Sequence, residues 1–331
     1  MARIYSKSSA AKSINEAGLS EFGIPAAVPE QSGDSFLTTT ASIFRDGDPV
    51  TINLGYNGDL RQEFMGFVRT RDLNMPLTIE CEGYSYQLRL KQSISHYYPS
   101  TTVKGLLEAA TKGTDVTVIC DVDITLQKIK LVNASASKII DFIHEVTDHN
   151  LCIFFISPTV LWCGLAFTEY ANGNNPFPQT GFNLSNGDTA SIAYRLGYNT
   201  VKDNRLRMRL PSEPVQILYH GKLATGDVVI TESKGKYHQT KIRHMLNNLQ
   251  SSATLQELAQ EKEYRKNYSG YEGEINGFLQ PYCQPGYKVT VKDSRYKERD
   301  GDYLATAINV DFGVNGAKRS VTLGPRIGFD I

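Results

Sequence analysis

The side chains best suited to metal chemistry are two histidines in the segment His144-Glu-Val-Thr-Asp-His149. A zincin helix needs its two histidines four residues apart, so that both face the same zinc ion. Here the spacing is five, which turns the second ring about 140° away from the first around a helix. The pair is therefore interpreted as satisfied or solvent-facing histidines, and the sequence predicts no metal site and no cofactor.

Three pairs of aspartates could supply oxygen ligands for calcium, but none lies in a twelve-residue loop that ends in glutamate. Gly beside Asp is typical of tight turns, so we interpret these pairs as turns. The three segments are Asp46-Gly-Asp48, Asp121-Val-Asp123 and Asp300-Gly-Asp302.

Signatures of the common catalytic folds are missing from the sequence: it has no phosphate-binding loop, no dinucleotide-binding glycine motif and no G-x-S-x-G. A cell-wall hydrolase would need a carboxyl group poised in a cleft, and Glu80, Glu82 and Glu272 are available. Alternation along the strand places the first two away from the core. The sequence therefore favours a protein that is not an enzyme, with a cell-wall hydrolase as the alternative.

One local basic cluster combines Lys234, Lys236, Lys241 and Arg243. It could line a passage, or it could be an ordinary solvated loop. Because so short a run makes few phosphate contacts and the net charge of the chain is +0, no specific nucleic-acid binding is expected. The 18 tyrosines leave a glycan-binding or receptor-binding β protein as a second alternative.

The composition is that of an ordinary folded protein of more than one domain. The chain has 331 residues, of which 40% are hydrophobic and 21% charged. Five cysteines without a C-x-x-C pair argue against a zinc ribbon and a disulfide framework. The most apolar window, 151–167, is interrupted by Ser157-Pro158-Thr159, so we expect two buried strands there and no membrane-spanning segment.

The elements around residues 47–90 follow a period of two. Val50, Ile52, Leu54 and Tyr56 alternate with polar residues, and Asn57-Gly58 follows as a type I′ turn. A returning strand over 64–68 and a third strand over 77–82, extended through 84–90, complete the pattern. The segment is therefore predicted to be an antiparallel meander.

A similar unit is predicted near the C-terminus. The order of turns and strands there repeats that of the first unit, which favours a duplication of two small antiparallel β-barrels. Chance similarity between two meanders is the alternative interpretation. The residues predicted to make the turns and strand starts of the repeated unit are Gly47, Asn57, Gly58 and Gly66 in the first copy and Gly286, Asp300, Gly301, Asn315 and Gly316 in the second.

Between the two units the apolar period becomes helical. Thr101 or Thr102 is expected to cap one short helix, and Ser135 or Ser137 another. Later, apolar residues at helical spacing over 242–249 and a capping-box pattern from Thr254 to Glu257 predict two more helices. The fold class is therefore α+β and mainly β.

The predicted domains follow from these elements. We expect a first barrel over 1–98, an α+β middle domain over 99–172, and a second barrel over 173–331. The second barrel would carry a helical insertion over about 238–267. The turn-rich segment 171–178 is the predicted boundary before the second barrel.

Several motifs in this order resemble the late control protein D family of phage baseplate hub proteins. They are Gly47-Asp-Pro-Val50, Phe64-x-Gly66-Phe67-Val68, Leu196-Gly-Tyr-Asn199, Tyr268-Ser-Gly270-Tyr-Glu-Gly273, Pro285-Gly286-Tyr-Lys-Val289 and Phe312-Gly-Val-Asn-Gly316. The family is related to the hub part of type VI secretion spike proteins. The resemblance covers nearly the whole chain, and it differs at Gly83, where family members often have an acidic residue.

The resemblance implies an architectural role in a baseplate. Such hubs are homotrimers whose paired tube-like barrels present six similar units to a hexameric tail tube and threefold symmetry to a spike. The tube protein, a separate spike protein, and tape-measure and baseplate wedge proteins are the implied partners. The implied location is the virion or a tail-like particle, assembled in the cytoplasm of the host bacterium.

Overall fold

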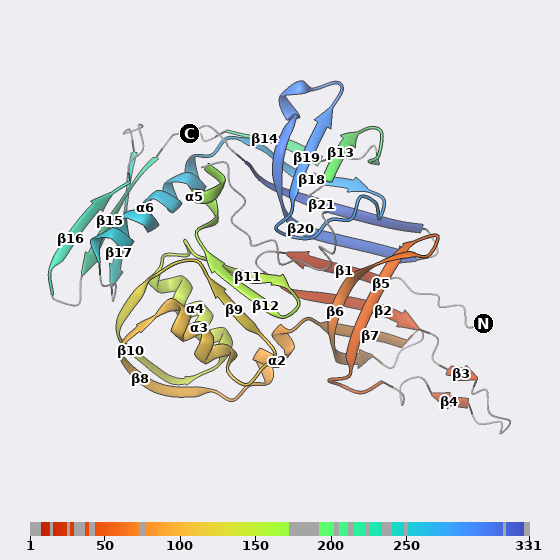
Figure 1. Ribbon diagram of the computed structural model, residues 1–331, viewed down its shortest axis with the longest axis horizontal. Helices are drawn as coiled ribbons and strands as arrows, with labels where there is room; N and C mark the ends of the chain where they lie inside the picture. Colours follow the sequence, from red (N-terminus) through yellow and green to blue (C-terminus); the bar gives the residue numbers. More distant parts are fainter. Residues whose placement is uncertain are drawn as a thin grey trace.

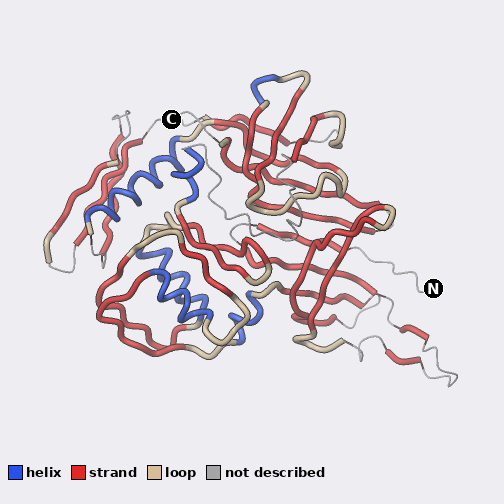
Figure 2. Tube along the Cα trace, in the orientation of Figure 1, coloured by secondary structure: helices blue, strands red, loops and turns tan. Residues whose placement is uncertain are grey.

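The computed structural model describes most of the chain, and the account below is restricted to those parts. They are residues 8–13, 16–24, 27–29, 37–39, 44–72, 77–171, 192–201, 205–210, 215–222, 226–233, 240–247, 251–313 and 316–327. Strands predominate, as Figure 2 shows, and most of them pair antiparallel. The mainly β, α+β fold class is therefore confirmed.

The first β unit contains five strands in the order β5-β6-β7-β2-β1. Their bounds are β1 Ser8–Ser13, β2 Glu16–Ile24, β5 Pro49–Tyr56, β6 Asp59–Asp72 and β7 Leu77–Glu82. A small hairpin of β3 (Ala27–Pro29) and β4 (Leu37–Thr39) precedes β5. Among the side chains that the structure describes in this unit, a buried apolar cluster comes from β6 and β7: Phe64, Val68, Ile79 and Cys81.

The second β unit has the same strand order, β19-β20-β21-β18-β14. Its strands are β14 Arg205–Arg209, β18 Gly270–Gly277, β19 Lys288–Asp293, β20 Gly301–Gly313 and β21 Gly316–Arg326. β13 (Ile192–Leu196) adds to β19 in parallel. In both units the chain visits the five positions in the same sequence, so the two units share one topology.

Two local details also repeat. The glycine before the first hairpin has a positive φ in both units, 91° at Gly47 and 87° at Gly286. The N–H of Gly47 donates to the carbonyl of Val68 at 2.8 Å, and the N–H of Gly286 donates to that of Ala305 at 2.8 Å. These bonds make Val68 and Ala305 equivalent positions.

A β-bulge follows each of these two positions. The register between β6 and β7 shifts between Val68 and Thr70, and the register between β20 and β21 shifts between Ala305 and Ala307. A bulge inserts one extra residue into one strand and is not demanded by a hairpin as such. A shared irregularity at equivalent positions therefore supports duplication over chance similarity.

The two units join edge to edge into one sheet. β1 of the first unit pairs antiparallel with β20 of the second over Ser8–Ser13 and 307–312. In Figure 1 the red strands β1 and β2 continue the layer formed by the blue strands β20 and β21. The described strands form an open path that ends at β14 and β5, so the two closed barrels of the sequence analysis stay a prediction.

The middle of the chain, below the sheet in Figure 1, packs two helices against a curved pair of strands, β8 (Ile94–Thr102) and β10 (Thr125–Ala134). The helices are α3 (Val103–Thr111) and α4 (Ala136–Val146). Thr102 and Ser135 cap them by accepting hydrogen bonds from main-chain N–H groups, as the sequence predicts.

A second sheet and a short helix complete the middle segment. β11 (Cys152–Ser157) and β12 (Val160–Gly164) form a hairpin, and β12 also pairs in parallel with β9 (Thr117–Cys120). The short helix α5 (Ala166–Ala171) follows. The predicted turn within 151–167 is therefore confirmed.

An insertion separates β14 from β18. It consists of β15 (Val215–Lys222), β16 (Val228–Glu232), β17 (Thr240–Asn247) and α6 (Ser252–Asn267). The strands form a separate sheet in the order β16-β15-β17, and α6 covers one face of it. Leu255 and Leu258 of α6 share a core with the helices of the middle segment.

Three predicted elements are wrong. Residues 84–90 do not extend the strand β7 but form the helix α2 (Ser85–Leu90). In the helix Ser85 and Arg89 both reach the carboxylate of Glu82, at 3.0 and 3.1 Å, which a strand would not permit. The helix predicted over 242–249 is replaced over 242–247 by the strand β17, which pairs in parallel with the buried strand β15 from Thr240 to Asn247.

The turn predicted at Asp300-Gly301 is the third error. The connection from β19 to β20 is a seven-residue arm, 294–300, that contains the 3₁₀ turn η1 (Lys297–Arg299), and Gly301 begins the returning strand. The start of α6 also differs from the predicted capping box, since Ser251 caps it and not Thr254.

Candidate functional site

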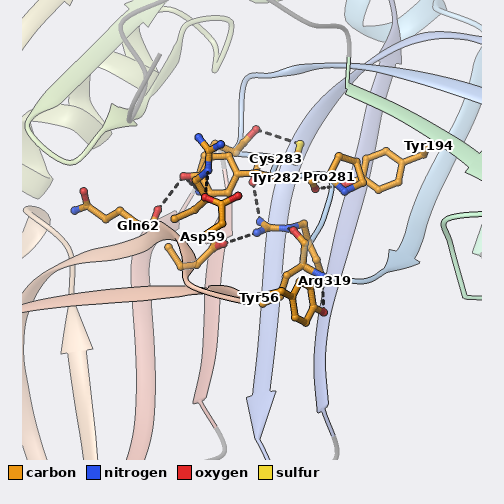
Figure 3. A network of polar contacts seen from close by, with 12 residues as sticks. Tyr56, Asp59, Gln62, Tyr194, Pro281, Tyr282, Cys283 and Arg319 are labelled. Atoms are coloured by element: carbon orange, nitrogen blue, oxygen red, sulfur yellow. Dashed lines mark hydrogen bonds and ion pairs between the residues drawn. The ribbon is translucent and has the colours of Figure 1, made fainter. Parts of the chain in front are cut away.

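The candidate site is the junction of the two β units, together with the sheet edges that the junction leaves open. Besides the β1–β20 ladder, the tip of the β5–β6 hairpin packs against the segment 278–284 and β21 of the second unit. Figure 3 shows this contact, with Tyr56, Gln62, Tyr282 and Arg319 among its residues.

A buried ion pair lies at the centre of the junction. The Arg319 side chain on β21 is 0% exposed, and its guanidinium donates to the carboxylate of Glu63 on β6, which is 2% exposed. Arg319 also donates from Nε to the carbonyl of Leu279 at 3.1 Å and from Nη1 to that of Cys283 at 2.8 Å. A buried charge is tolerated where it is paired and hydrogen-bonded, so the first unit supplies what Arg319 of the second requires.

Tyrosines extend the network to either side of the ion pair. The Tyr282 ring lies 5.1 Å from the Arg319 guanidinium, and its hydroxyl donates to the carbonyl of Gln62 at 2.8 Å. The N–H of Leu279 donates to the Tyr56 hydroxyl at 3.5 Å. The hairpin tip is thus bound to the second unit through its main chain and its side chains.

Burial changes the pKa values of the thiol and phenol groups in the junction. Burial raises the pKa of the Cys283 thiol to about 12, and burial also raises the pKa of the Tyr282 hydroxyl. The thiol and the phenol are therefore neutral at physiological pH, and the Glu63 carboxylate is occupied by Arg319. The arrangement can therefore hold the two units together through neutral hydrogen-bonding groups around one paired charge.

Several strand edges have no neighbouring strand among the described residues, and the outer edge of β14 is one of them. β14 pairs with β18 on one side only. One edge of β6 pairs with β7. The other edge pairs with β5 as far as Phe67, and the N–H of Val68 then donates to the main-chain carbonyl of Asp48. Beyond Val68, Arg71 contacts the segment before β5, because its guanidinium donates to the carbonyl of Phe44 and pairs with Asp46 at 3.1 Å. Met208 on β14 is 58% exposed.

The arm 294–300 protrudes from the second unit, at the top of Figure 1. Asp293 holds its base, because its carboxylate accepts hydrogen bonds from the N–H groups of Arg295 and Tyr296 and pairs with Arg299 at 3.2 Å. Burial alone would raise the pKa of Asp293, but these donors outweigh it and lower the pKa. Tyr296 on the arm is 50% exposed.

The predicted turn residues lie at different places in the two units. Asn57 and Gly58 have φ values of 53° and 87°, as a type I′ turn requires. A Cβ on Gly66 would lie 2.2 Å from the carbonyl oxygen of Glu82, so this glycine permits a close approach of β7. Gly301 is similarly close to the Arg326 side chain, and Gly316 has a φ of 98°.

Part of the predicted site lies outside the described residues. These positions are Asn315, Lys234 and Lys236. For Lys241 and Arg243 only their position on β17 is described. A passage lined by this cluster stays a prediction.

The carboxylates and histidines considered for chemistry are scattered. Glu82 is buried against Arg89, contrary to the outward position predicted for it, and Glu272 pairs with Arg209 at 3.1 Å. His144 and His149 stack with ring centroids 5.8 Å apart. Among the described residues, no three His, Cys, Asp or Glu side chains come together as a metal site would require.

A cavity of about 780 Å³ lies between the middle segment and α6. Asp123, Glu169 and Glu257 are among its lining residues. Nothing in the sequence suggested it, because its lining comes from three separate segments. In the same described part of the chain, no helix is long and apolar enough to cross a membrane.

The sequence analysis missed Arg319 and Glu63. Both lie in strands whose neighbours alternate normally, and only the packing of two distant segments makes them partners. No signal in the sequence singled them out, because both strands carry other charged residues that are exposed or half-buried, such as Arg61 on β6 and Lys318 on β21.

Comparison with solved structures identifies the fold. The chain is similar to the 43 kDa tail protein of prophage MuSo2 from Shewanella oneidensis (TM-score 0.59, 12% identity, 98% of this chain and 96% of that one). It is also similar to a tail protein from Neisseria meningitidis MC58 (TM-score 0.58, 14% identity, 97% and 92%).

A third similar structure comes from a secretion system. It is an Escherichia coli component of the type VI secretion system, described as structurally similar to the T4 bacteriophage tail proteins gp27 and gp5 (TM-score 0.56, 9% identity, 98% and 74%). No protein-family model and no curated protein sequence matches the chain. The fold is thus that of phage tail proteins, and the resemblance found in the sequence is confirmed at the level of the fold.

Proposed function

We propose that the chain is the structural hub of a contractile phage tail or a tail-like injection particle. In this role it forms a homotrimer that adapts a hexameric tail tube to a trimeric spike. The proposal rests on the duplication: two units with one strand order and one shared bulge, joined edge to edge within the chain.

The junction within the chain supports a ring. The outermost strand of the first unit, β1, pairs with the second strand of the other unit, β20. The sheet is therefore left with two unlike ends, and contacts between unlike surfaces build rings or filaments and not twofold dimers. A ring of three chains would contain six similar units, which is the symmetry a hexameric tube needs.

The proposed partners follow from this geometry. One face of the ring would meet the tail tube protein, and the other a separate spike protein, with tape-measure and baseplate wedge proteins nearby. The location would be the baseplate of a virion or tail-like particle. The similar structures bear the names of tail proteins and of a secretion-system component, which favours this role over a hydrolase or a glycan-binding protein.

Light scattering combined with electron microscopy tests the proposal. We expect a particle of three times the chain mass of 36.8 kDa, and threefold rings with six similar lobes in class averages. A protein that stays monomeric at high concentration and forms no ring with its tube protein would contradict the proposal. Release of fragments from purified peptidoglycan would favour the hydrolase instead.

A further inference from the structure

We propose that Cys120 and Cys163 are a modification site, at which oxidation forms a reversible disulfide that fastens the edge strand β9 to β12. Both cysteines are free thiols in the structure. The inference concerns the middle segment of this chain and goes beyond the proposed role in a baseplate.

The two cysteines lie directly opposite each other on neighbouring strands. β9 and β12 pair in parallel, and Cys120 is the register partner of Cys163. Neighbouring strands of a sheet lie about 4.7–4.9 Å apart, which is inside the Cα separation of about 4.4–6.8 Å that a disulfide spans. The spacing of the two strands therefore suits a disulfide at this pair.

Both thiols lie on the same face of the sheet. Cys163 is part of the core that the middle segment shares with α6, and Cys120 packs against that core. The preceding register pair, Ile119 and Trp162, belongs to a separate cluster, as the alternation of side chains along a strand requires. Cys152 also packs against that separate cluster, so it lies on the opposite face from the pair.

The thiols contact each other and differ in their access to solvent. The Cys163 thiol donates a hydrogen bond to Cys120, and the Cys120 thiol donates to the carbonyl of Val122 at 3.4 Å. The bond between the thiols chiefly lowers the pKa of Cys120, whereas the same bond and then burial raise the pKa of Cys163. Cys120 is half-buried and Cys163 is 0% exposed, so Cys120 is the thiol that an oxidant reaches first.

The oxidant that suits this arrangement is a small disulfide such as oxidised glutathione. The Cys120 thiolate attacks the disulfide, forms a mixed disulfide, and releases one glutathione, which takes up the proton of Cys120. Cys163 then attacks the Cys120 sulfur, and the second glutathione leaves with the proton of Cys163. Two protein thiols are thereby oxidised to one disulfide, and one glutathione disulfide is reduced to two thiols.

The strand that this disulfide would fasten has few other attachments. β9 is the edge strand of its three-stranded sheet, and its ladder with β12 contains four register pairs within the described part of the chain. Directly after the strand, Asp121, Val122 and Asp123 line the cavity beside α6. A bond at Cys120 would therefore fix both the end of β9 and the start of this cavity wall.

The proposed function indicates when the bond forms, and this point alone rests on it. The cytoplasm keeps thiols reduced, whereas the surroundings of a released particle are oxidising. A particle assembled in a host bacterium would therefore carry the two thiols first and the disulfide only after its release.

Oxidation of the folded chain with oxidised glutathione tests the pairing. After the remaining thiols are blocked with iodoacetamide, trypsin and chymotrypsin together cut the chain between each two of Cys120, Cys152 and Cys163, and mass spectrometry identifies the linked peptides. We expect the link between Cys120 and Cys163 to exceed any link to Cys152 by about tenfold, because Cys152 lies on the other face of the sheet. Dithiothreitol should reverse the link. Equal linkage to Cys152, or recovery of both cysteines as blocked thiols, would overturn the proposal.

Two variants test the order of the steps. In Cys163→Ala the second thiol is missing, so glutathione should stay on Cys120 at an occupancy about tenfold above that of the parent protein. The matched control Cys152→Ala should form the link between Cys120 and Cys163 as the parent does. A parent that retains as much glutathione on Cys120 as Cys163→Ala does would contradict the second step.

Hydrogen exchange tests whether the bond fastens β9. The N–H of Asp121, which donates to the carbonyl of Cys163 at 2.9 Å, should exchange about tenfold more slowly in the oxidised protein and regain its former rate with dithiothreitol. A disulfide that leaves this rate unchanged would overturn the fastening role. These measurements need neither a trimer nor a tail particle, so their failure would leave the proposed function standing.

Discussion

The ion pair between Glu63 and Arg319 gives the sharpest test of how the two units are held together. The variant Glu63→Gln keeps the shape of the side chain but removes its charge, which leaves the fully buried Arg319 without a counter-charge. Breaking a buried pair in this way costs about 3–5 kcal/mol of unfolding free energy. The effect should be large because neither side chain can turn to water.

Urea denaturation measures this loss, with Asp59→Asn as the matched control. Asp59 lies at the same hairpin tip and pairs with Arg61 at 3.5 Å, but both side chains are exposed, so its loss should cost about 0–1 kcal/mol. Hydrogen exchange should also quicken at the hairpin tip and in the segment 278–284 of the Glu63 variant.

A double variant separates the charge effect from the packing effect. Glu63→Leu with Arg319→Met removes both charges and should be more stable than Glu63→Gln, because no unpaired buried charge remains. If Glu63→Gln costs no more than Asp59→Asn, the reasoning that this pair joins the two units is refuted.

The remaining predictions concern the arm, the glycines and the cysteines. The pKa of Asp293 is lowered in the folded protein, so its carboxylate should stabilise the fold above about pH 4 and lose this effect as the pH falls through the lowered pKa. The difference in melting temperature between the parent protein and Asp293→Asn should therefore shrink in acid. Gly58→Ala should lower the unfolding free energy by about 1–2 kcal/mol, because Gly58 has a positive φ. Gly66→Ala should lower it more, because the new Cβ would meet the main-chain oxygen of Glu82. Calorimetry that ranks the two variants in the opposite order would contradict this prediction. Cys120 should react with iodoacetamide before Cys283 does, as peptide mass mapping can show. A hydrogen bond from the neighbouring Cys163 thiol chiefly lowers the pKa of Cys120, whereas burial raises the pKa of Cys283.

Local signals in the sequence predicted much of the fold. Asn57-Gly58 identified the first hairpin, because few dipeptides accept two positive φ values. Thr102 and Ser135 identified the starts of two helices, since their side chains satisfy main-chain donors there. Gly47 and Gly286 correctly indicated two related strand starts.

The elements predicted wrongly are those whose form depends on distant partners. Residues 84–90 alternate like a strand, but Glu82 and the aromatic ring of Phe67 stabilise them as a helix. Residues 242–249 have helical spacing, but pairing with β15 makes 242–247 part of a strand. Local periodicity cannot report such tertiary contacts.

The candidate site was the least predictable part. Arg319 and Glu63 are 256 residues apart in the chain, and neither lies in a motif. The open edge of β14 is also invisible in the sequence, because an unpaired strand and a paired one can have the same residues. Only the pairing of strands in the structure shows which strand edge has no neighbouring strand.

The bulge shared by β6 and β20 is an irregularity that two unrelated meanders have no reason to place at equivalent positions. The attachments of the two units differ, because the sheet and helix between β14 and β18 have no counterpart between β1 and β2, which two residues connect. In the proposed ring of three chains this attachment would stand on every second unit only, so a ring of six similar units would still present three equal surfaces to a partner of threefold symmetry.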